Sequence, residues 1–99
     1  MKAIDRTTKQ FVASLRAEIP DLRISVERSK NAYGQSNYVH IRTKDHRYWK
    51  VRISDHPVGM RRAKSGREDL YIWAGSWPPT WAVWLGQFRR TLMDGQGGG

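Results

Sequence analysis

Residues 38–56, YVHIRTKDHRYWKVRISDH, decide the fold. Two runs in this stretch, 38–42 and 48–53, alternate apolar with polar residues, which is the period of a strand buried on one side. Opposite residues of a hairpin point to the same face, so only an odd-numbered loop places apolar beside apolar. The pattern therefore predicts an antiparallel hairpin with the three-residue loop 44–46.

This register predicts which side chains face each other across the hairpin. On the apolar face, Ile41 lies opposite Trp49 and Val39 lies opposite Val51. On the other face, the predicted pairs are Tyr38 with Arg52, His40 with Lys50, and Arg42 with Tyr48.

Further elements are predicted on both sides of the hairpin. Alternation predicts a strand over 22–27 and another over 68–74. The polar stretch 29–36 and the basic stretch 55–67, which contains proline and glycine, predict loops.

Two helices are predicted, one near each end of the chain. Thr7 to Gln10 has capping-box spacing, and the apolar positions that follow predict a helix over 7–18, before Pro20. Prolines are tolerated in a first turn, so a last helix is predicted to begin near Ser76. Its apolar positions follow a helical period: Trp81, Trp84, Leu85, Phe88 and Leu92.

These elements predict an α+β fold in the order αββββα. We expect a four-stranded antiparallel sheet with the N-terminal and C-terminal helices on one face. A single domain is expected over 1–94, and the glycine-rich residues 95–99 are expected to form a flexible tail. The expected core contains Leu22, Ile24, Val26, Val39, Ile41, Trp49, Val51, Ile53, Leu70 and Ile72 from the sheet, and Phe11, Val12, Leu15, Ile19, Trp84, Leu85 and Phe88 from the helices.

Composition narrows the function classes. The 99 residues contain no cysteine, which excludes disulfides and thiolate metal sites, and they contain no apolar run long enough for a membrane span or a secretory signal. A soluble, cytoplasmic protein is expected. The net charge is +9, and segment 23–67, with twelve cations and three carboxylates, carries the whole excess. Such a segment is typical of a surface for a polyanion, although charge can also serve only to keep a small domain dispersed.

One face of the predicted sheet interleaves aromatic rings with cations. Rings stack on unpaired bases, and Lys and Arg neutralise phosphates, so this face is a candidate surface for nucleic acid, with single strands favoured. Two alternatives remain open: the side chains only stabilise the sheet through cross-strand contacts, or the N-terminal helix covers them. The candidate residues are Arg23, Tyr38, His40, Arg42, Tyr48, Lys50, Arg52, Tyr71 and Trp73.

The basic loop adds four more candidate cations. They can grip phosphates without reading bases, or dock on an acidic protein surface, or only be solvated. These residues are Arg61, Arg62, Lys64 and Arg67.

Two Asp-His pairs, Asp45-His46 and Asp55-His56, raise the question of a metal or catalytic site. They flank the same strand, which separates them by about 25 Å, too far for one metal ion. No nucleophile elbow or phosphate-binding glycine loop is found. We therefore predict no catalytic residue, no metal and no cofactor, and we interpret Asp55 as a turn-forming residue. A ligand contact, or a hydrolase or nuclease using Asp55-His56 or His40, are the alternatives.

Residues 38–56 also resemble small proteins encoded by phages and prophages. The resemblance covers a Tyr-Val-x-Val/Ile strand, a short turn and a strand ending in Arg-Ile-Ser-Asp-His, here residues 52–56. It implies a mobile-element origin and a bacterial host cytoplasm. It assigns no catalytic or binding role to any residue.

The sequence therefore supports two alternative hypotheses about function. The first is a non-enzymatic nucleic-acid-binding protein that uses the mixed sheet face and the basic loop. The second is a phage-encoded inhibitor, such as an anti-CRISPR protein, that uses the same surface against an acidic host protein or a ribonucleoprotein.

Overall fold

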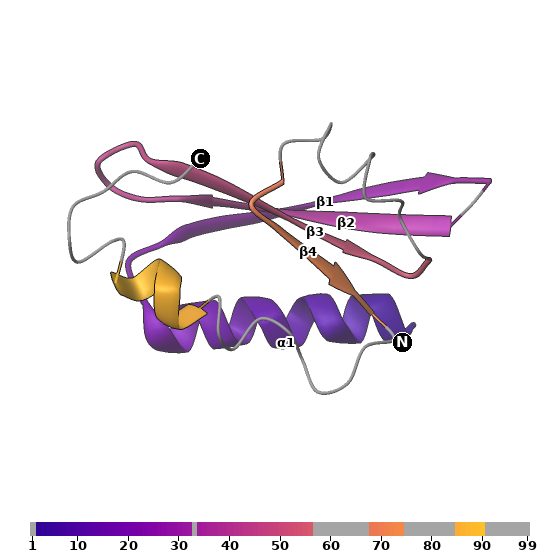
Figure 1. The fold of residues 1–99 in the computed structure, drawn as a ribbon, viewed down its shortest axis with the longest axis horizontal. Coiled ribbons are helices and arrows are strands. Elements are labelled where there is room, and N and C mark those ends of the chain that lie inside the picture. The colour runs from indigo at the N-terminus through magenta and orange to yellow at the C-terminus, as the bar shows by residue number, and fades with distance from the viewer. Residues whose placement is uncertain (1, 33, 57–67, 75–84, 91–99) are drawn as a thin grey trace.

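The computed structural model describes residues 2–32, 34–56, 68–74 and 85–90. It contains a four-stranded sheet with the strand order β1-β2-β3-β4 and a long helix packed on one face (Figure 1). A short helical segment covers 85–90. The longer elements are α1 (Ala3–Glu18), β1 (Arg23–Asn31), β2 (Gly34–Arg42), β3 (Tyr48–Ser54) and β4 (Leu70–Trp73).

The predicted central hairpin is confirmed pair by pair. β2 and β3 are antiparallel, and all five predicted pairs are observed, among them Ile41 opposite Trp49. The loop is the expected three residues, because the Thr43 N–H donates to the Arg47 carbonyl over 3.1 Å. His46 closes the turn with φ 68°, in the left-handed region. Alternation alone was sufficient here because only one register buries every apolar side chain.

The predicted all-antiparallel sheet is wrong at β4. This strand runs parallel to β3, with Ile72 beside Ile53, so the sheet is mixed. A tight hairpin would have forced the two strands to be antiparallel, but the connection 55–69 is long enough to return to the start of β3. The observed β4 also covers only 70–73 of the predicted 68–74.

The predicted loop over 29–36 is also wrong. β1 continues to Asn31 and β2 begins at Gly34, so only positions 32 and 33 separate the strands. The sequence signal was missing because the residues at this end are polar on both faces, so no apolar alternation marks the strands.

α1 begins four residues earlier than predicted. Ile4 is only 1% exposed and starts the buried stripe of the helix. Thr7, the expected first residue of a capping box, lies inside the helix. Its neighbour Thr8 donates its hydroxyl to the Ile4 carbonyl over 2.8 Å. A Ser or Thr inside a helix can donate to the carbonyl of residue i−4, so Thr residues ahead of a Gln do not by themselves mark the start of a helix.

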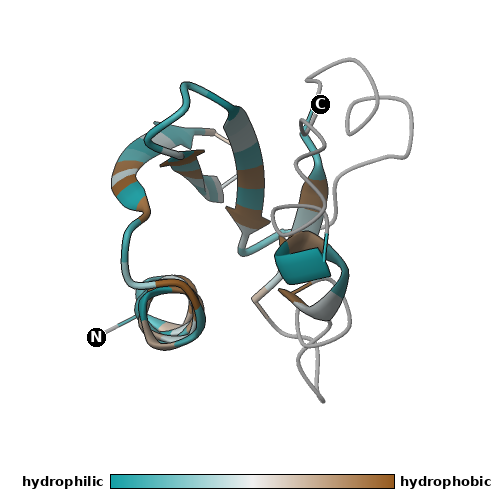
Figure 2. Cartoon of the chain, turned by 90° about the vertical axis from the view of Figure 1, so that its left-hand side faces the viewer, coloured by the Kyte–Doolittle hydropathy of each residue, from teal (hydrophilic) through white to brown (hydrophobic). Residues whose placement is uncertain are grey.

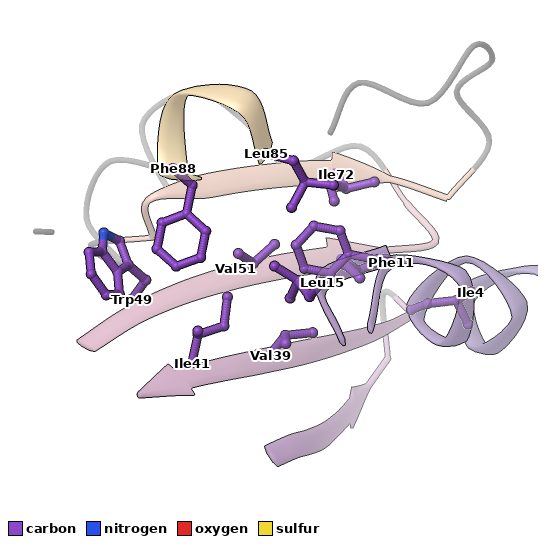
Figure 3. Packing of buried hydrophobic residues seen from close by; sticks show 11 residues of the cluster. Ile4, Phe11, Leu15, Val39, Ile41, Trp49, Val51, Ile72, Leu85 and Phe88 are labelled. Atoms are coloured by element: carbon purple, nitrogen blue, oxygen red, sulfur yellow. The ribbon is translucent and has the colours of Figure 1, made fainter. Parts of the chain in front are cut away.

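The core lies between the sheet and α1 (Figures 2 and 3). The Trp49 and Phe88 rings meet edge to face with centroids 4.6 Å apart. Through Phe88 and Leu85, the segment 85–90 covers the same sheet face as α1. The buried apolar residues are Ile4, Phe11, Leu15, Val39, Ile41, Trp49, Val51, Ile53, Ile72, Leu85 and Phe88.

One predicted core position is exposed, and five others are only partly buried: Val12, Ile19, Leu22, Ile24 and Leu70. Val26 on β1 is 49% exposed, because α1 packs through Phe11 and Leu15 over the middle of the sheet and leaves the β1 edge uncovered. Residues 76–84 of the predicted last helix, the basic loop over 57–67 and the tail 95–99 lie outside the described residues. Within the described ranges, no helix has the length and apolar content needed to cross a membrane.

Candidate nucleic-acid interface

The side chains that point away from α1 form what we call the polar face. Strand pairing places nine predicted site residues on it. Eight are aligned with one another across the sheet, and Trp73 is aligned with Ser54, which shares a face with Arg52. Neither α1 nor the segment 85–90 lies on this side, since both pack on the apolar face (Figure 1). The nine residues are Arg23, Tyr38, His40, Arg42, Tyr48, Lys50, Arg52, Tyr71 and Trp73.

Cations of the polar face lie over its rings. The Lys50 Nζ lies 4.7 Å from the centre of the Tyr38 ring, and the Arg52 guanidinium lies 5.5 Å from it. The Arg42 guanidinium lies 4.8 Å from the centre of the Tyr48 ring. These distances are those of cation–π contacts, which restrict the cations without neutralising their charge.

The positive charges of this face are also close to one another. Arg23 lies directly opposite Arg42 in the β1–β2 ladder, an arrangement that is unfavourable for like charges. Among the described residues, no carboxylate forms a salt bridge with Arg23, Arg42, Lys50 or Arg52. The face therefore carries a concentrated positive charge that an external anion would relieve.

His40 joins three strands through its two ring nitrogens. Nδ1 lies 2.6 Å from the Tyr48 hydroxyl, and Nε2 lies 3.0 Å from a carboxylate oxygen of Glu27. Partial burial raises the pKa of Tyr48, so its phenol stays protonated at neutral pH. Glu27 was not predicted as a residue of the polar face, although the alternation along β1 places it on the same face as Arg23. The trio orients the imidazole at the centre of the face.

Hydrogen bonds fix the end of the polar face near Ser54. The Arg52 Nε donates to the Ser36 hydroxyl over 3.2 Å, and this hydroxyl lies 2.7 Å from that of Ser54. Tyr71 donates its hydroxyl to the His56 carbonyl over 2.9 Å. Trp73 is 47% exposed, which leaves a large aromatic surface beside the cations.

Asp55 closes the end of the sheet. Its Oδ1 accepts the Gln35 N–H over 2.9 Å and lies 2.9 Å from Nδ1 of His56. The Asp55 N–H donates to the Gln35 carbonyl over 3.2 Å. These contacts, with His56 first and the Gln35 N–H second, lower the pKa of Asp55. The geometry agrees with the interpretation of Asp55 as a residue that ends a strand.

Gly34 makes this closure possible. Its φ of 146° is unfavourable for residues with a side chain, and a Cβ at this position would lie 2.6 Å from Nδ1 of His56. The other Asp-His pair lies at the opposite end of β3, where Asp45 pairs with Arg47 at 2.9 Å and accepts a hydrogen bond from Thr43. The two pairs are therefore separate, as predicted from strand length.

The four cations of the basic loop, Arg61, Arg62, Lys64 and Arg67, lie outside the described residues. In the part of the chain that is described, no group of three or more His, Asp or Glu side chains is arranged to hold a metal ion.

A second polar cluster, on the helix side of the sheet, was not predicted. Asp5 Oδ1 accepts hydrogen bonds from Arg28, Gln35 and Asn37 at 3.2–3.3 Å. The Asn37 amide also donates to the Thr8 hydroxyl over 2.9 Å. These bonds, that of Asn37 first, lower the pKa of Asp5. The cluster was missed because Gln35 falls in the stretch expected to be a loop, Arg28 and Asn37 border that stretch, and Asp5 precedes the predicted start of the helix.

Comparison with protein-family models, with curated proteins and with solved structures finds no match to this chain.

Proposed function

We propose that the protein binds nucleic acid on its polar face, with single strands favoured over duplexes. The observation that carries the proposal is the group of unneutralised cations on this face, including Arg23 directly opposite Arg42. Like charges in such an arrangement destabilise a sheet, and phosphates would turn the repulsion into attraction.

The rings support a preference for single strands. Unpaired bases stack on exposed aromatic side chains, and each stacked base contributes about 1–3 kcal/mol. Trp73 is half exposed at one edge of the polar face, beside β3, which bears Lys50 and Arg52. A strand whose phosphates follow the cations can therefore place a base on this indole.

The proposed activity is binding without catalysis, in the cytoplasm of a bacterial host. The polar face would supply phosphate contacts, and the four cations of the basic loop would add more. The Glu27-His40-Tyr48 trio uses both ring nitrogens of His40, so it would hold the side chains of the face in place and would not bond the ligand through the imidazole. No cofactor is part of the proposal.

Fluorescence anisotropy with labelled single-stranded and double-stranded oligonucleotides of one sequence tests the proposal. The double variant Arg42→Gln/Lys50→Gln should weaken binding and reduce the slope of log affinity against log salt by about 1.4 for a single strand. Arg6→Gln/Arg16→Gln is the matched control, because it removes the same charge from exposed positions on α1. Absence of binding at low salt, or equal effects of both double variants, would contradict the proposal.

A second candidate is an inhibitor that binds an acidic host protein or a ribonucleoprotein, in the manner of anti-CRISPR proteins. One observation favours it: the Tyr38 ring already contacts two cations, Lys50 and Arg52, so it offers less surface for stacking. Affinity purification from a bacterial lysate, with and without nuclease, separates the candidates. A partner that is retained after nuclease and lost with Arg42→Gln/Lys50→Gln supports protein binding.

A further inference from the structure

Among the described residues, no strand pairs with the outer edge of β1. β1 is the first strand of the sheet and pairs with β2 on one side only. In an antiparallel ladder the N–H and C=O groups of alternate residues face the partner, so the remaining groups of this nine-residue strand face outward. All its side chains except that of Ile24 are exposed. Such an edge is a template for another strand.

A groove of about 390 Å³ runs beside this edge, between α1 and β1. Val12 of α1 and Val26 of β1 form its apolar part, and the buried Asn37 contributes to its lining. The groove exists because α1 packs over β2 and β3, so that β1 extends beyond the helix. An apolar side chain in the groove would cover Val26.

The surroundings of the groove are positive. Lys9 and Arg28 line it, and Lys30 follows Arg28 on the same face of β1. Lys2 is close enough to Lys30 to lower the pKa of the Lys30 ammonium by repulsion.

Of the described residues that line the groove, only Asp5 carries a carboxylate. It is already hydrogen-bonded to Arg28, Gln35 and Asn37. An acidic ligand would therefore complete the charge balance.

We propose that the outer edge of β1 binds an extended, acidic segment of a partner protein by strand addition, with an apolar side chain in the groove beside Val26. Main-chain hydrogen bonds supply affinity in this mode, and alternate side chains supply specificity. A second copy of the chain fits less well, since β1 carries Arg23, Arg28 and Lys30 against the single carboxylate of Glu27. The surface is separate from the polar face, so the inference does not depend on nucleic-acid binding.

Peptide binding to the full chain tests this inference. The probe is a synthetic nine-residue peptide with Val at position 4, Glu at positions 2, 6 and 8 and Thr elsewhere, so that Val and the Glu side chains share the face that meets the groove. In a second peptide Lys replaces each Glu. We expect micromolar binding of the acidic peptide, measured by anisotropy, and at least about tenfold weaker binding of the basic one. Two further peptides carry N-methyl groups on alternate backbone amides, one peptide at the odd-numbered positions and the other at the even-numbered positions. In strand addition one set should abolish binding and the other should preserve it.

Variants of the chain locate the binding site. Val26→Thr retains a β-branched residue and should weaken acidic-peptide binding about tenfold, as should Lys9→Glu. Circular dichroism checks that both variants fold. Arg16→Glu, further along α1, is the matched control and should have a smaller effect.

Four results would overturn the inference: no binding of the acidic peptide, equal effects of both N-methylated peptides, unchanged affinity in Val26→Thr, or displacement of the peptide by an oligonucleotide. Sedimentation of the protein alone tests the second-copy alternative. A dimer that Val26→Thr dissociates would assign this edge to self-association instead.

Discussion

The two faces of the central hairpin use the same strands for different purposes. On the side of α1, Val39, Ile41 and Val51 are fully buried. Their neighbours in sequence lie on the polar face, where Lys and Arg side chains lie over tyrosine rings and keep their charge. One face removes water from apolar groups and supplies stability, whereas the other retains charge that folding does not require. Period-two alternation can therefore separate the residues that hold a fold from those available to a ligand.

The largest effect expected from this comparison concerns stability. Ile41→Ala should lower the free energy of unfolding by about 2–5 kcal/mol, because it leaves a cavity in a fully buried site. Arg42→Ala, at the next position but on the polar face, should cost at most about 1 kcal/mol, because relief of the repulsion from Arg23 offsets part of the lost contact with the Tyr48 ring. Urea denaturation measures both values. Similar losses in the two variants would show that the polar face is structural too.

A smaller effect is expected where β2 begins and Asp55 ends the neighbouring strand. Gly34→Ala should destabilise the fold by about 1–3 kcal/mol, because position 34 has a positive φ and lacks room for a Cβ. Gly86→Ala is the matched control: its Cβ would meet nothing within 4 Å, and alanine favours a helix. Thermal unfolding should therefore shift in opposite directions. A neutral Gly34→Ala would mean that the closure by Asp55 and His56 is dispensable.

The third prediction concerns the ring at the edge of the polar face. Trp73→Ala should weaken binding of a single-stranded oligonucleotide by about 1–3 kcal/mol, through the loss of one stacked base, and should affect duplex binding less. Anisotropy titrations with both ligands at one salt concentration measure the difference. Equal losses for the two ligands would indicate that Trp73 contributes charge-independent contacts other than stacking.

The smallest effect concerns stability in acid. Asp55 has a lowered pKa in the folded protein, so the unfolded chain binds more protons between that pKa and the ordinary value of 3.8. Its stabilising contribution is therefore complete at neutral pH and disappears as the pH falls below about 4. Asp55→Asn should be less stable at pH 7 and should lose less on acidification. His56→Ala should act in the same direction, because it removes the largest cause of the shift. Urea midpoints from pH 2 to 7 that match the wild type would contradict this.

How far the sequence predicts the molecule depends on whether a pattern has one physical solution. The register of β2 with β3 could be predicted because only one pairing buries Ile41 against Trp49. The same alternation placed the rings and cations on one face. The direction of β4 could not be predicted, because the long connection after Ser54 permits either orientation.

On the helix side of the β1–β2 hairpin, the sequence pattern did not predict which residues are buried. Asn37 is 2% exposed but is polar, so it gave no strand signal before its partners Asp5 and Thr8 were known. Val26 showed the reverse error: it is apolar at a core-like position, yet α1 does not reach it. Local pattern specifies which face a residue belongs to, whereas burial also depends on where a distant helix packs.

The indole N–H signals of Trp49 and Trp73 in a two-dimensional NMR spectrum test the central claim most directly. One ring lies in the core at 4% exposure and the other lies on the polar face at 47%. Variants with phenylalanine at each position assign the two signals. When a short oligothymidylate is added at low salt, the Trp73 signal should shift progressively while that of Trp49 remains in place. An unchanged Trp73 signal at saturating ligand would contradict nucleic-acid binding on the polar face.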